Sequence, residues 1–137
     1  MSDAEIGKFL NEIGQLLAED TEYPLDGTLL HAELDQGYVS PSIYKDLGDH
    51  AFYRQPDLDR LGNCLLDLWE AYPPNMRWVE MLYVVRGQAF EAKFIYLGDL
   101  DPNEWPMERR ERLVKAHFGD KPIVYPPWED EEGDFEL

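Results

Sequence analysis

The chain has a single cysteine, Cys64, and therefore cannot form an internal disulfide. No apolar run approaches the roughly 20 residues of a helical membrane span, and the first residues lack the basic segment that opens a secretory signal peptide. Bases are also scarce, because 12 Lys and Arg oppose 29 Asp and Glu and leave a formal net charge of −17 at pH 7. This charge repels phosphate and anionic lipid. We therefore expect a cytoplasmic protein that binds neither nucleic acid nor membrane directly.

Motifs of the common enzyme classes are absent as well. The chain has no glycine-rich phosphate loop, no paired cysteines for zinc, no His-Glu-x-x-His and no Gly-x-Ser-x-Gly. Residues 99–104 imitate the start of a calcium loop, but Glu104 stands where that loop needs glycine and Arg110 where it needs glutamate. Cys64 falls on the apolar stripe of a predicted helix, which favours a buried thiol over a reactive one. We predict that the protein is not an enzyme and holds no metal or cofactor.

The three histidines keep one enzymatic alternative open. His31, His50 and His117 fall on a predicted strand, a loop and a predicted helix, with no spacing that implies a shared metal. At such positions a hydrogen-bonded or surface histidine is more common than a catalytic one. An enzyme would need His31 or His117 beside carboxylates in a concave pocket, which only the tertiary structure can form.

Hydrophobic periodicity and turn residues divide the chain into eight regular elements. Apolar side chains at spacings of three and four predict helices, and alternating β-branched or aromatic segments predict strands. Pro41 lies inside one predicted strand, which indicates an edge position or a bulge. In chain order we predict a helix over 2–19, strands over 29–34, 38–44 and 51–54, a helix over 57–72, strands over 78–85 and 89–96, and a helix over 106–118.

The order α-β-β-β-α-β-β-α predicts an α+β fold with a mostly antiparallel sheet of about five strands and three helices. In the second hairpin Phe90, Ala92 and Phe94 share one face, on which we expect helices to pack. The domain is predicted to span residues 1–121. Residues 122–137 are rich in proline and acids, and they are predicted to form an extended C-terminal tail.

Tryptophan occurs at four positions with two expected roles. Trp69, Trp78 and Trp105 fall in regular elements or at the start of a helix, where packing is the usual role. Trp128 stands just before the acidic run of the predicted tail. A tryptophan exposed beside carboxylates is a candidate anchor for a binding partner, because tryptophan is enriched among interface hot spots.

The surplus acids gather at two places. Seven acids and no base lie between Lys8 and Lys45, enough to spread a negative field over one side of a small domain, and residues 122–137 hold six acids and no base. Such a run usually marks a solvated surface that favours solubility, but it also accelerates association with a basic partner. The expected partner-binding residues are Glu19, Asp20, Glu22, Asp26, Glu33 and Asp35 in the first cluster, and Trp128, Glu129, Asp130, Glu131, Glu132 and Asp134 in the second.

Residues 105–110 read Trp-Pro-Met-Glu-Arg-Arg and lead to Phe118, Gly119 and Pro122. With the order of the elements and the hairpin that ends in 90–96, this segment resembles the YezG-like family of bacterial immunity proteins. The resemblance extends from the first helix to about Pro122. It implies a small cytoplasmic antitoxin that binds the toxic C-terminal domain of a secreted polymorphic or contact-dependent toxin, typically a nuclease. The resemblance assigns no inhibitory residue by position.

The charge of the chain agrees with what this resemblance implies. A nuclease is basic where it grips phosphate, so an inhibitor that covers this site must present carboxylates there. We expect an immunity protein that neutralises a nuclease toxin. The alternative is an acidic mimic of nucleic acid that blocks a DNA-binding host protein. Promiscuity distinguishes them, because a mimic competes with DNA on several basic proteins, whereas an immunity protein discriminates its own toxin from relatives.

Overall fold

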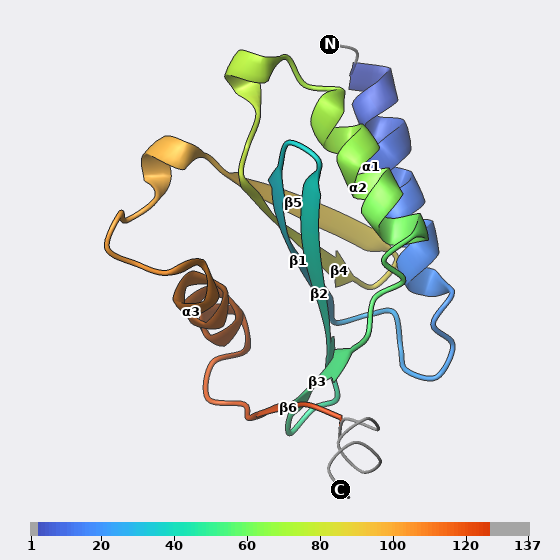
Figure 1. The fold of residues 1–137 in the computed structure, drawn as a ribbon. Coiled ribbons are helices and arrows are strands. Elements are labelled where there is room, and N and C mark those ends of the chain that lie inside the picture. The colour runs from blue at the N-terminus through green and yellow to red at the C-terminus, as the bar shows by residue number, and fades with distance from the viewer. Residues whose placement is uncertain (1–2, 127–137) are drawn as a thin grey trace, which may run out of the picture.

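The computed structural model describes residues 3–126 of the chain (Figure 1). The α+β class and the predicted order of eight elements are confirmed, and a further short strand follows them. The helices and strands in chain order are α1 (Asp3–Ala18), β1 (Thr28–Asp35), β2 (Tyr38–Asp46), β3 (Ala51–Arg54), α2 (Arg60–Glu70), β4 (Glu80–Arg86), β5 (Ala89–Ile95), α3 (Pro106–Phe118) and β6 (Ile123–Val124), with 3-10 turns η1 (Pro74–Met76) and η2 (Leu97–Asp99).

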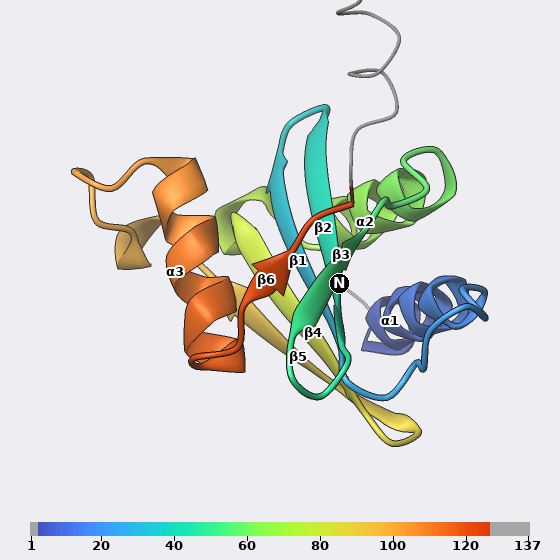
Figure 2. The same cartoon turned by 90° about the horizontal axis from the view of Figure 1, so that it is seen from below.

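The sheet separates two layers of helix. Helices α1 and α2 lie side by side on one face, and α3 lies on the other (Figure 2). Successive side chains of β1 point to opposite faces of the sheet and so contribute to both cores. Leu30 belongs to the core under α1 and α2, and Leu29 belongs to the core under α3. Ala92 and Phe94 pack against the core of α1 and α2. The predicted packing of helices on this face of the second hairpin is therefore confirmed for Ala92 and Phe94, whereas Phe90 is 38% exposed.

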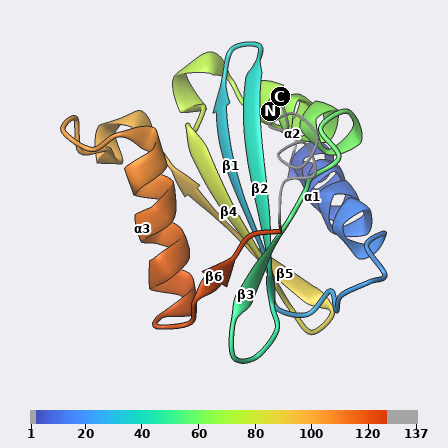
Figure 3. The same ribbon diagram turned by 60° about the horizontal axis from the view of Figure 1, so that its bottom comes forward.

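The sheet has six strands in the order β5-β4-β1-β2-β3-β6, rather than about five. Four neighbouring pairs are antiparallel, but β6 runs parallel to β3, so the sheet is mixed (Figure 3). The prediction that placed all of 122–137 in a tail is thus wrong for Ile123–Val124, while residues 127–137 lie outside the described part. The backbone amide of Ala51 donates to the carbonyl of Pro122 at 2.9 Å. Two residues carry no readable periodicity, so only the tertiary pairing defines this strand.

Pro41 occupies a local edge of the sheet, as its sequence position indicated. It lies opposite Ala32 of β1 in a register that runs without a break along β2. On its other side β2 pairs with β3 only from Ile43 to Asp46. Pro41 therefore has no neighbouring residue of β3 with which to form a backbone hydrogen bond. This suits proline, which has no backbone N–H to donate.

A buried ionic group joins α3 to the sheet. Glu80 of β4 accepts a hydrogen bond from His31 Nε2 of β1 at 2.8 Å and another from Arg109 Nε of α3. All three side chains are buried. One carboxylate oxygen of Glu80 therefore binds β1 and the other binds α3. Val114 and Phe118 of α3 add apolar contacts to the same side of the sheet. A buried charge persists only with such partners.

We predict that Glu80→Ala lowers the free energy of unfolding by about 3–5 kcal/mol, because it leaves the guanidinium of Arg109 buried without its carboxylate. Chemical denaturation measures the loss, and hydrogen exchange should show α3 opening before α1 and α2. Glu111→Ala, at an exposed position on α3, is the control and should remain near wild type. Equal stability of the two variants would contradict the structural role of Glu80.

Candidate partner-binding site

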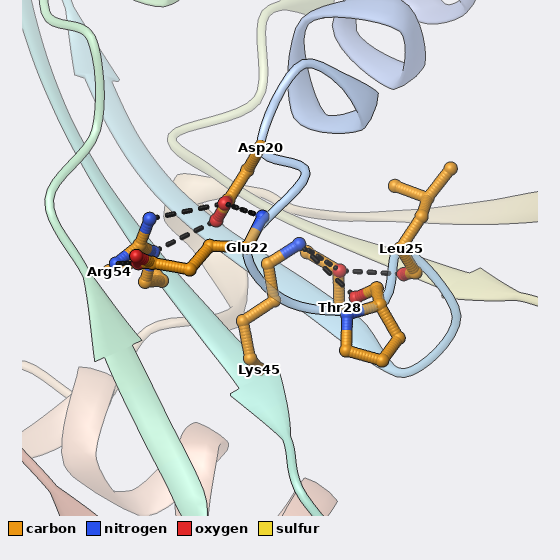
Figure 4. Close-up of polar contacts among 7 residues, drawn as sticks. Asp20, Glu22, Leu25, Thr28, Lys45 and Arg54 are labelled. Carbon is orange, nitrogen blue, oxygen red and sulfur yellow. Dashed lines mark hydrogen bonds and ion pairs between the residues drawn. The ribbon is translucent and has the colours of Figure 1, made fainter.

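Three of the predicted partner-binding acids meet at a pocket of about 400 Å³. The pocket lies where the loop after α1 crosses the adjacent ends of β2 and β3 (Figure 4). The loop supplies Glu19, Asp20 and Glu22, and the strands supply Lys45 and Arg54. Acids and bases therefore share this site, in contrast to the purely acidic surface that the sequence suggested.

Arg54 binds two of these acids at once. Its Nε and Nη2 donate to the two carboxylate oxygens of Asp20 at 2.9 and 3.1 Å, and its Nη1 lies 2.9 Å from Glu22 Oε2. The guanidinium also lies 4.8 Å from the ring centre of Tyr23. Burial alone would raise the pKa of Asp20, but the hydrogen bonds from Arg54 and from the amide of Glu22 outweigh it and lower that pKa. The loop after α1 is thereby fixed to β3.

Lys45 stands at the base of the same site and is only 1% exposed. Its ammonium donates to the hydroxyl of Thr28 at 2.9 Å and to the carbonyl of Pro24 at 3.4 Å. The Thr28 hydroxyl in turn donates to the carbonyl of Leu25 at 2.6 Å. Burial lowers the pKa of Lys45, and the nearby charge of Asp20 opposes this shift. Lys45 thus ties β2 to the loop by hydrogen bonds to neutral oxygens.

Glu19 is held by a different arginine. Arg60, at the start of α2, donates to both carboxylate oxygens of Glu19, at 2.5 and 2.8 Å. These hydrogen bonds lower the pKa of Glu19. Two arginines therefore pair with three acids, Arg60 with Glu19 and Arg54 with Asp20 and Glu22, so these acids contribute less to a long-range negative field than their number implies.

Sequence reasoning missed Arg54 and Lys45. A signal for both was present, since they are the only bases between Lys8 and Arg60. In a segment so rich in acids, an isolated base on a predicted strand is a candidate for ion pairing. Which acid it meets depends on the fold, because Asp20 and Arg54 are 34 positions apart.

The other three acids of the first cluster lie elsewhere. Asp26 accepts a hydrogen bond from the amide of Gly87, in the turn between β4 and β5, at 2.7 Å. Asp35 accepts one from its neighbour Gln36 at 2.7 Å, and Glu33 is half-buried on β1 opposite Glu80. At ~3.3 Å per residue, Asp35 is about 23 Å along β1 from the loop end of that strand. The six acids therefore do not form one surface, and Trp128, Glu129, Asp130, Glu131, Glu132 and Asp134 of the second cluster lie outside the described residues.

The three histidines occupy unrelated places. His31 is buried against Glu80, while His50 Nδ1 lies 2.6 Å from Oδ1 of its neighbour Asp49. His117 is half-buried at a separate pocket of about 380 Å³, and burial lowers its pKa. Within residues 3–126, no group of three or more His, Cys, Asp or Glu side chains is placed to hold a metal ion.

The cysteine and two of the tryptophans are buried as predicted. Burial and the nearby carboxylate of Glu12 raise the pKa of Cys64 to about 12, which opposes thiolate formation. Trp69 and Trp78 belong to the core of α1 and α2. The packing role predicted for Trp105 is wrong, because its side chain is 74% exposed. Trp105 precedes α3, and this helix packs on the sheet through side chains further along it.

No protein-family model matches the chain, and no curated protein matches it. The resemblance to YezG-like immunity proteins therefore remains an expectation. None of the helices in the described part of the chain is long and apolar enough to span a membrane.

We predict that Asp20→Asn lowers the free energy of unfolding by about 1–2 kcal/mol at pH 7, because two charge-assisted hydrogen bonds to Arg54 are lost. The folded pKa of Asp20 lies below its ordinary value of 3.8. The contribution of the Asp20 carboxylate to the free energy of unfolding is therefore complete when the pH is above that ordinary value. It disappears as the pH falls through the lower pKa of the folded state.

Urea unfolding at a series of pH values from 7 downward measures this difference between wild type and Asp20→Asn. The stability curves should converge at the acidic end. Glu22→Gln is the matched control, since it removes a carboxylate from the same arginine at a side chain that is 65% exposed. A larger loss for Glu22→Gln than for Asp20→Asn would contradict the assignment of Asp20 as the main partner of Arg54.

Proposed function

We propose that this protein is an immunity protein that binds a basic toxin domain, a nuclease, of a polymorphic or contact-dependent toxin and neutralises it. One observation carries the proposal: the exposed surface of the described residues is strongly acidic. Of the described residues, seventeen Asp and Glu are exposed against six Lys and Arg. The six remaining bases are Lys45 and Arg109, which are buried, and Arg54, Arg77, Arg110 and Lys121, which are half-buried.

This division of charge favours a basic partner. Half of the bases are buried or half-buried, and some of them pair with carboxylates, as Arg54 does with Asp20 and Arg109 does with Glu80. Six of the described acids are also buried or half-buried, so the exposed acids still exceed the exposed bases by eleven. A nuclease presents the opposite sign where it holds phosphate, and opposite charge both accelerates encounter and disfavours wrong partners. The resemblance of residues 105–110 to YezG-like immunity proteins supports the same assignment.

Affinity capture with the tagged chain from its source organism, joined to expression of the adjacent gene, tests the proposal. The expected result is one stoichiometric basic partner that is encoded next to this gene, is toxic alone and becomes harmless when this chain is co-expressed. Capture of several unrelated DNA-binding proteins that DNA displaces would instead identify a nucleic-acid mimic. An adjacent product that remains equally toxic with and without this chain would refute the proposal.

Removing charge from both predicted clusters should slow association with that toxin domain by about tenfold or more at low salt. The variant carries Glu22→Gln and Asp35→Asn with Glu129→Gln, Asp130→Asn, Glu131→Gln, Glu132→Gln and Asp134→Asn. Association rates over a salt series give the measurement, and the slope against salt should flatten. Replacing the first two changes by Glu91→Gln and Glu111→Gln, at exposed positions on β5 and α3, provides a control of equal net charge. Unchanged association of this variant would exclude the seven substituted acids as the charges that guide the partner.

A further inference from the structure

Exposed apolar side chains concentrate in the connection between β5 and α3. Among the described residues the three most exposed large apolar side chains are Trp105, Leu97 and Met107, at 74%, 73% and 63%. All three fall within eleven residues of the chain, and Tyr96 beside them is 41% exposed. We call these four residues the Trp105 surface. Single exposed apolar residues are ordinary, but four on one short connection make that connection a candidate interaction site.

Hydrogen bonds hold the backbone of this segment in place. The amide of Trp105 donates to the Glu108 carboxylate at 2.9 Å, and its carbonyl accepts from the amide of Arg109, the residue that anchors α3 in the sheet. The Glu104 carboxylate accepts two bonds from Arg112, at 2.8 and 2.9 Å. The exposed indole is thus presented from an ordered helix start, which lowers the entropy cost of binding through it.

The segment that carries the Trp105 surface is acidic, although the arginines of α3 follow it directly. Residues 97–108 contain four carboxylates and no base. Arg112 neutralises Glu104, while Asp99, Asp101 and Glu108 are exposed and each accept a hydrogen bond from a backbone amide. Exposed apolar side chains that share one connection with exposed carboxylates are complementary to an apolar pocket that basic side chains surround.

We infer that the Trp105 surface is the anchor by which this protein holds its toxin, with the indole of Trp105 inserted into an apolar pocket of a basic protein domain. The inference rests on the proposed function. A buried tryptophan at the centre of an interface supplies much of the binding energy in many complexes. A second copy of this chain is a poorer occupant, because two-fold contact would bring Asp99, Asp101 and Glu108 toward the same carboxylates of its partner. An anionic membrane would repel these carboxylates.

The anchor and the distant acids have separable kinetic roles. Charges spread over a surface act mainly on the rate of encounter, whereas a desolvated apolar anchor acts on the rate of dissociation. The loop after α1 and the Trp105 surface can therefore serve one partner without both touching it. Figure 1 and Figure 3 place the connection before α3 at the outer edge of the molecule, away from α1 and α2.

Trp105→Ala should weaken binding of the toxin domain from the adjacent gene by about 30-fold or more, mainly through faster dissociation. Surface-immobilised full-length chain and a catalytically inactivated toxin domain provide the measurement. The fold should persist, since the side chain of Trp105 is exposed and its bond to Glu108 comes from the backbone. Leu58→Ala, which removes a 57% exposed side chain just before α2, is the matched control and should change affinity less than about twofold.

The outcomes separate the two proposals. If the wild-type chain fails to bind or protect, the proposed function is wrong and this inference fails with it. If the wild type protects but Trp105→Ala binds equally tightly, only the anchor is wrong. Size-exclusion chromatography tests self-association. A wild-type dimer that Trp105→Ala converts to a monomer would assign the Trp105 surface to contact between two copies of this chain and overturn the inference.

Discussion

The carboxylate of Glu80 is the contact on which the two-layered architecture most depends. It lies on β4, inside the sheet, and accepts hydrogen bonds from β1 and from α3. Helix α3 offers few buried side chains of its own, namely Arg109, Val114 and Phe118. The ionic contact therefore fixes the position of a helix whose apolar contribution is small. The amide of Arg109 also donates a hydrogen bond to the carbonyl of Trp105, so the residue that Glu80 holds belongs to the first turn of α3.

The fold changes the meaning of the net charge. The sequence has 29 acids against 12 bases, and among the described residues folding buries or half-buries six of each, which is half of the bases but only about a quarter of the acids. Arg54 and Arg109 are drawn into contacts with Asp20 and Glu80, and Lys45 is buried against the hydroxyl of Thr28. Long basic side chains can bury their apolar stems while their heads find oxygen partners. Seventeen carboxylates against six bases remain on the exposed surface of the described residues, which suits a protein whose partner is basic.

The proposed partner recognition divides between two physical effects. Long-range attraction depends on the sum of exposed charge and is screened within about a Debye length of roughly 8 to 10 Å. Close contact depends on local shape and on apolar area removed from water. The surface around Trp105 and Leu97 offers apolar area, and the acids of the rest of the molecule offer attraction. Neither feature requires a catalytic group, and His31 is committed to holding the sheet and α3 together.

Local patterns in the sequence determined the eight main elements, the α+β class and the burial of Cys64, Trp69 and Trp78, because periodicity and turn chemistry act over a few neighbouring residues. Only the tertiary structure decided the strand at Ile123–Val124, the pairing of Asp20 with Arg54 and the separation of Asp35 from the other acids. These features join residues far apart in the chain, and a run of like charge does not reveal which base it will meet. The exposure of Trp105 has the same origin: a tryptophan at the start of a helix is buried only if the helix docks with that end against the sheet, and α3 docks through Arg109, Val114 and Phe118.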